Sequence, residues 1–165
     1  MNSKQEIVSL IHDEFGKEEF LVSKANYNLI EVEPNLWEFT IYFETMKSLT
    51  RVPELEEAIL DPKPHFEATA LLDNSSLNLC KGKIIEQTES WDENREENLS
   101  NVYYFEHTSL EKLRVEILES DTKFIKVLIS GRTLINGSNH NNPDTTIKTT
   151  PITFKKDITL ERSVM

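Results

Sequence analysis

Apolar residues recur at every second position along much of this chain, which is the pattern of β-strands with one buried and one solvent-facing side. In the clearest run, four apolar residues alternate with more polar neighbours, at Trp37, Phe39, Ile41 and Phe43. An apolar run at residues 29–32 precedes it, and Glu33-Pro34-Asn35 lies between the two. Because proline favours a turn, the sequence predicts a β-hairpin here.

Six further segments have the composition of strands: residues 66–72, 77–88, 102–107, 113–118, 124–134 and 147–154. The fourth and fifth are joined by the short polar segment Glu119-Ser120-Asp121-Thr122, so we expect them to pair antiparallel. Gly82 interrupts the apolar phase of the second segment, which favours a β-bulge there. Tyr103 and Tyr104 would point to opposite faces of the third segment, so one of the two is expected in solvent.

Two segments have helical spacing instead. Residues 3–15 begin with a capping box at Ser3 and Glu6. They continue with an apolar stripe at Ile7, Leu10, Ile11 and Phe15. We expect this stripe to pack on a sheet of the same molecule, and a partner-binding helix is the alternative. Gly16 would end this helix, and a second short helix is predicted at 53–60. The expected fold class is α+β and mostly β. An N-terminal amphipathic helix packs on a curved antiparallel sheet or β-sandwich of about seven to nine strands, in one domain spanning residues 1–165.

The net charge of −11 is confined to the first part of the sequence. Residues 1–97 hold 21 acidic and 9 basic side chains, whereas residues 98–165 hold 8 and 9. A one-sided negative field attracts basic partners and repels nucleic acid and anionic membranes. The expected partner is therefore a basic protein, with no role for nucleic acid or a membrane; the sequence does not indicate an oligomeric state.

Motifs of the common catalytic and cofactor-binding classes are absent from the sequence. There is no Gly-rich phosphate loop and no G-x-S-x-G nucleophile turn. The four histidines lack metal-ligand spacing, and His65 and Glu67, which would share one strand face, are expected to lie in solvent. Cys80 is expected to be a buried, inert thiol. These observations predict no catalytic residues, no metal and no cofactor, and they argue against an enzyme.

One polar segment combines acidic charge with an aromatic side chain. The candidate partner-binding residues are Glu86, Glu89, Trp91, Asp92, Glu93, Glu96 and Glu97. Tryptophan is enriched among residues that dominate binding energy, so Trp91 either packs back on the core or anchors a partner. A plain solvated loop and a cation site remain alternatives, although the segment lacks the central glycine of an EF-hand.

The sequence thus predicts a non-enzymatic, acidic interaction protein that binds and neutralises a basic partner, as a toxin-immunity protein does. A cytoplasmic location is expected because the chain begins with no signal peptide and has a single cysteine. One alternative is a small-ligand-binding protein or enzyme with a pocket in a curved sheet, lined by Trp37, Phe39, Phe43 and the apolar stripe of the N-terminal helix. Another is a structural subunit of a larger assembly.

Overall fold

The computed structural model describes residues 6–12, 16–50, 63–104, 106–136 and 149–163. Ten strands form one sheet in the order β5-β10-β11-β12-β1-β2-β3-β4-β8-β9. Their bounds are β1 (Ile7–His12), β2 (Gly16–Glu33), β3 (Leu36–Thr50), β4 (His65–Asp73), β5 (Ile84–Gln87), β8 (Asn101–Tyr104), β9 (Glu106–Ser109), β10 (Glu111–Ser120), β11 (Phe124–Asn136) and β12 (Thr149–Arg162). A separate small hairpin joins β6 (Trp91–Asp92) to β7 (Glu97–Asn98), and η1 (Asn74–Ser76) is a single 3₁₀ turn.

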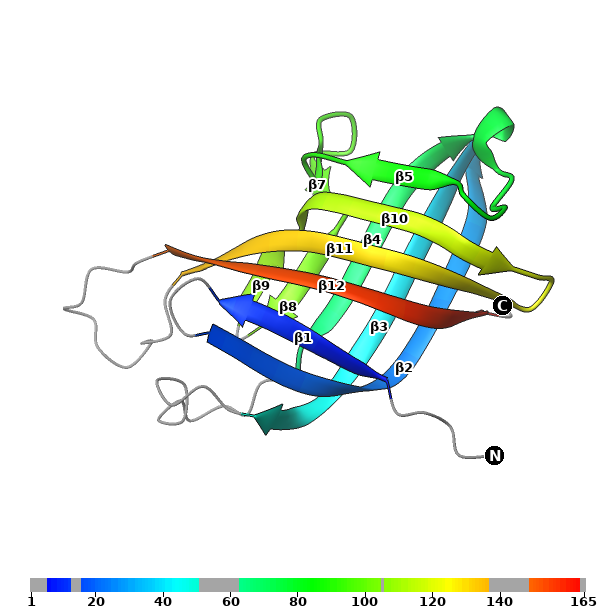
Figure 1. Cartoon of the computed structure of the whole chain (residues 1–165). Helices are drawn as coiled ribbons and strands as arrows, with labels where there is room; N and C mark the ends of the chain where they lie inside the picture. The colour runs from blue at the N-terminus through cyan, green and yellow to red at the C-terminus, as the bar shows by residue number, and fades with distance from the viewer. Residues whose placement is uncertain (1–5, 13–15, 51–62, 105, 137–148, 164–165) are drawn as a thin grey trace.

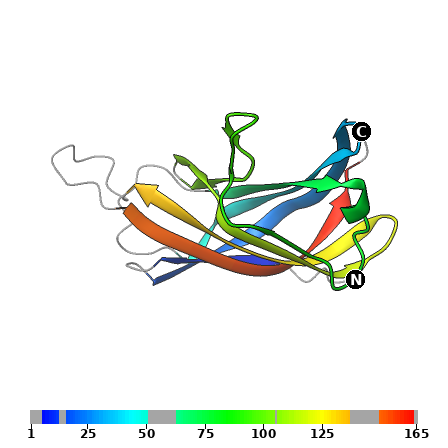
Figure 2. The same cartoon turned by 90° about the horizontal axis from the view of Figure 1, so that it is seen from above.

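The ten-stranded sheet folds back on itself into two facing layers (Figures 1 and 2). Strands β5, β10, β11, β12 and β1 form the front layer of Figure 1, and β3, β4, β8 and β9 form the layer behind it. The long strand β2 passes from one layer to the other. It pairs with β1 near its start, with β3 along most of its length, and with β12 in parallel at Asn26 and Tyr27.

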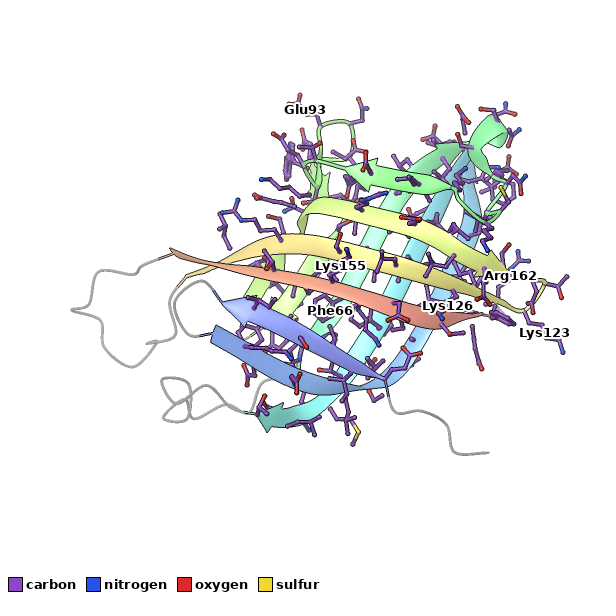
Figure 3. All side chains as sticks on the ribbon, in the orientation of Figure 1. Phe66, Glu93, Lys123, Lys126, Lys155 and Arg162 are labelled. Atoms are coloured by element: carbon purple, nitrogen blue, oxygen red, sulfur yellow. The ribbon has the colours of Figure 1, made fainter. Side chains whose placement is uncertain are left out.

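The core lies between the two layers and is built from the alternate apolar positions of the strands. Phe43 stacks on Phe66 with ring centroids 4.3 Å apart, and Phe154 from the opposite layer lies 4.7 Å from Phe66. Figure 3 shows Phe66 in this interior. Full burial of each such side chain contributes about 1.5–3 kcal/mol. The core also contains a polar pair, because the hydroxyl of buried Tyr104 donates to the carboxylate of buried Glu18.

The predicted N-terminal helix is wrong, and with it the α+β fold class: the described residues contain no α-helix and the fold is nearly all β. Residues 7–12 form β1, and Gly16 opens β2 at a positive φ of 88°. Val8 and Leu10 point into the core, whereas Ile7 and Ile11 are exposed. The sheet therefore buries the alternate positions and not the helical stripe. Residues 1–5 and 13–15, and the second predicted helix at 53–60, lie outside the described residues.

The predicted strands fare better where their alternation is regular. The hairpin of β2 and β3 turns at Pro34 and Asn35, and β10 pairs antiparallel with β11. Segment 77–88 is only partly correct, since its strand is limited to β5. Gly82 lies in a turn at φ 87° outside any strand, so the predicted bulge is wrong there. Cys80 lies in the same non-strand segment and is exposed, contrary to the expectation of a buried thiol.

Candidate functional site

The acidic segment forms a hairpin that stands away from the two layers of the sheet (Figure 2). Its tip lies between β6 and β7, and Figure 3 shows Glu93 at the far end. The turn is held by Asp92, whose Oδ1 accepts hydrogen bonds from the backbone N–H groups of Asn94 at 2.8 Å and Arg95 at 3.2 Å. Short Asp side chains commonly stabilise turns in this way, so the hairpin has a defined local structure.

Two buried serines fix the base of the hairpin. Ser90 is 2% exposed, and its hydroxyl donates to the side-chain oxygen of Asn98 at 2.9 Å. The backbone N–H of Leu99 donates to the carbonyl of Ser90 at 2.8 Å. Ser100 is fully buried, and its hydroxyl oxygen accepts from the backbone N–H of Thr69 on β4 at 3.0 Å. The projecting hairpin therefore starts from an ordered, hydrogen-bonded base.

Arg95, the one basic residue of the hairpin, attaches it to the sheet. Its Nη1 lies 2.9 Å from Oε2 of Glu38, on the outer face of β3, and 3.9 Å from Oε1 of Glu97. The hydrogen bond to Glu38 is the largest cause of the raised pKa of Arg95. An arginine that bonds carboxylates on both the sheet and the hairpin restricts how far the hairpin can swing. Sequence reasoning missed this contact, because Glu38 and Arg95 are far apart in the chain.

Trp91 does not pack back onto the core. Its side chain is 53% exposed at the foot of the hairpin. It borders an open hollow of about 310 Å³ whose other walls include Ser109, Glu111 and Lys112 at the corner between β9 and β10. Tryptophan is enriched among the residues that dominate binding energy at protein interfaces.

The structure brings most of the predicted site residues together. Asp92, Glu93, Glu96 and Glu97 belong to the projecting hairpin, and Glu89 borders the hollow next to Trp91. Glu86 is separate, because it lies on β5 and its Oε1 is 3.6 Å from Nη1 of Arg114. Glu89, Glu93 and Glu96 form no ion pair with any described residue. Among the described residues, the charges of these three carboxylates therefore have no cation that compensates them.

A second cluster, which the sequence did not indicate, lies on the outer face of the rear layer. The strand register places Glu44, His65, Tyr103 and His107 in one row across β3, β4, β8 and β9. The rings of His65 and Tyr103 stack with centroids 4.9 Å apart, and His107 lies 4.9 Å from Tyr103. Tyr103 is on the solvent side and Tyr104 is buried, which confirms that one of the two faces outward.

Within the described ranges no three His, Cys, Asp or Glu side chains converge to hold a metal ion. Phe39 and Phe43 are buried in the core, and the indole N–H of half-buried Trp37 donates to Asn74 at 2.8 Å. No helix in the described part of the chain is long and apolar enough to cross a membrane. The chain matches no protein-family model, no curated protein and no solved structure.

Proposed function

We propose that this protein is a non-enzymatic, cytoplasmic interaction protein that binds and neutralises a basic protein, for example as the immunity partner of a toxin. The contact surface is the acidic hairpin with Trp91 at its foot. The partner contributes lysine or arginine side chains that pair with Glu89, Glu93 and Glu96. It also contributes an apolar group that covers the exposed indole.

One observation carries this proposal: a large, exposed aromatic side chain stands beside uncompensated carboxylates on a hairpin that is already held in place. Ordering a flexible loop on binding costs about 0.5–1.5 kcal/mol for each immobilised side chain. The hydrogen bonds of Asp92, Ser90 and Arg95 remove part of that cost before any partner arrives.

The proposal is tested by affinity capture from extracts of the host cell with the immobilised protein. Two variants remove the surface, Trp91→Ala and the triple change Glu89→Gln, Glu93→Gln and Glu96→Gln. A matched control neutralises three exposed carboxylates elsewhere, at Glu33, Glu119 and Glu161. Captures are compared at about 0.1 M and about 1 M salt, where the Debye length is about 10 Å and about 3 Å.

We expect the wild type and the control triple to retain the same basic protein at low salt and to release it at high salt. Both hairpin variants should lose it. The proposal fails if no basic protein is retained at low salt, or if the hairpin variants and the control triple retain it equally. Because both triples change the net charge by the same amount, a general charge effect cannot produce the expected difference.

A further inference from the structure

The acidic hairpin is followed directly in the chain by β8, and β8 and β9 form one edge of the ten-stranded sheet. β8 pairs with β4 at only three positions, His65 with Tyr103, Phe66 with Val102 and Glu67 with Asn101. The hairpin follows directly through Leu99 and Ser100. Its position therefore depends in part on how firmly β8 is held against β4, together with the Arg95–Glu38 ion pair and the hydrogen bond between the Thr108 hydroxyl on β9 and the Thr133 hydroxyl on β11.

Two imidazoles meet at this joint. His65 is on β4 and His107 is on β9, so β8 with Tyr103 lies between them. Adjacent strands are about 4.8 Å apart, which puts the backbones of β4 and β9 about two such spacings from each other. The ring centroids are nevertheless only 5.9 Å apart. The two rings thus lean toward each other over Tyr103.

We propose that His65 and His107 form an acid-sensitive latch. As neutral rings they pack around Tyr103 and hold β8 and β9 on β4; when both are protonated they repel, and the joint that carries the acidic hairpin loosens. The latch does not rest on the proposed function. Only its consequence, release of a partner at acid pH, does so.

The surrounding charges partly oppose this repulsion. Glu44 on β3 lies opposite His65, and Glu67 on β4 is its neighbour on the same face, while Lys24 on β2 lies beyond Glu44. The Glu44 carboxylate is engaged by the hydroxyl of Tyr42. Burial of His65, followed by the charge of His107, outweighs the two carboxylates and lowers the pKa of His65 below its ordinary value of 6.5.

The sign of the effect follows from that direction. A histidine whose pKa is lowered in the folded protein favours folding in its neutral form. Its contribution is complete above about pH 6.5 and is lost as the pH falls through the folded-state pKa. Repulsion between two unit charges about 6 Å apart lowers the equilibrium constant for the closed form of the joint. The decrease is about threefold in a water-like medium and about a hundredfold at an effective dielectric constant of about 20.

Amide hydrogen exchange of the protein alone tests the latch. The N–H of Leu99 donates to Ser90 and that of Leu110 to Ser100, so both report on the base of the hairpin. We expect their protection factors to fall about tenfold relative to that of Val127 in β11 between about pH 7.5 and about pH 5.

His65→Gln should abolish most of this fall. His107→Gln should reduce it by the part that is due to charge repulsion, because burial of His65 still disfavours its charged form. Tyr103→Phe, which removes no titrating histidine, should retain it. The latch is refuted if protection at Leu99 and Leu110 does not change with pH in the wild type. It is also refuted if either histidine variant shows the same change as the wild type. Because no partner is present, this result is independent of the capture experiment with the Trp91 variant.

Discussion

Removal of the Ser100 hydroxyl should destabilise the protein more than its size suggests. Ser100 is fully buried between the end of the hairpin and the sheet, and Thr69 on β4 is 4% exposed. The Thr69 N–H donates to the hydroxyl at 3.0 Å. The hydroxyl can in turn donate to the Thr69 carbonyl at 3.1 Å or to the side-chain oxygen of Gln87 at 2.9 Å.

The magnitude follows from which of these groups water can reach after Ser100→Ala. Gln87 is half-buried and can exchange its lost partner for water. The Thr69 N–H is enclosed, so it loses its acceptor without replacement, at a cost of about 1–3 kcal/mol. For a chain of this length each kcal/mol lowers Tm by about 2–4 °C. A decrease of about 2–12 °C is therefore expected.

Urea denaturation followed by tryptophan fluorescence measures this cost, and an unchanged slope with denaturant would show that the folded state keeps its compactness. Ser23→Ala is the matched control, since Ser23 also donates one hydrogen bond, to the Glu44 carbonyl, but is exposed. It should change the free energy of unfolding by less than about 0.5 kcal/mol. If Ser100→Ala is equally harmless, the burial argument is refuted.

Four further outcomes are expected. Gly131→Ala would place a Cβ 2.6 Å from Cδ1 of Leu110, so overpacking should cost about 1–3 kcal/mol in a denaturation experiment. Burial, then the hydrogen bond to a glutamate, raises the pKa of Tyr42 from 10.0 to about 12. The stability that this shift contributes is complete below pH 10.0 and is lost as the pH rises through about 12. Tyr42→Phe should therefore remove the tyrosine ionisation near pH 12 from an absorbance titration. Exposed Cys80 should react with a thiol reagent in the native protein at the rate found for the unfolded chain. Arg95→Ala should change stability by less than about 1 kcal/mol, yet raise the fluorescence anisotropy decay amplitude of the indole at the hairpin foot.

The sequence predicts those parts of the fold in which the apolar residues fit the period of a strand and do not also fit the period of a helix. Residues 37–44 alternate strictly; of their odd positions, Phe39, Ile41 and Phe43 are buried and Trp37 is half-buried. The pairing of β10 with β11 was also predictable, because a short polar turn leaves antiparallel pairing as the simple solution. In both places, local pattern and tertiary structure require the same buried face.

The first strand shows what happens when two periods fit the same residues. Residues 7–12 read Ile-Val-Ser-Leu-Ile-His, which supplies a helical stripe at Ile7, Leu10 and Ile11 and a strand face at Val8 and Leu10. β1 is a central strand, with β12 on one side and β2 on the other. Hydrogen bonds to two neighbours, and burial of Val8 against the core, outweigh a capping box that isolated residues would favour. No local signal reveals those neighbours.

The candidate site, too, could be predicted only in part from the local sequence. The acidity and Trp91 are local, so composition located them. The geometry that gives them meaning comes from partners far away in the sequence. Several carboxylates on strands form ion pairs with nearby cations, as Glu38 does with Arg95 and Glu86 does with Arg114. The contact with Glu38 also uses the hairpin's one cation to fix its position, which leaves Glu89, Glu93 and Glu96 as the free charges. The proposed contact surface therefore rests on the positions of these three carboxylates on and next to the projecting hairpin, and the total charge of −11 does not reveal those positions.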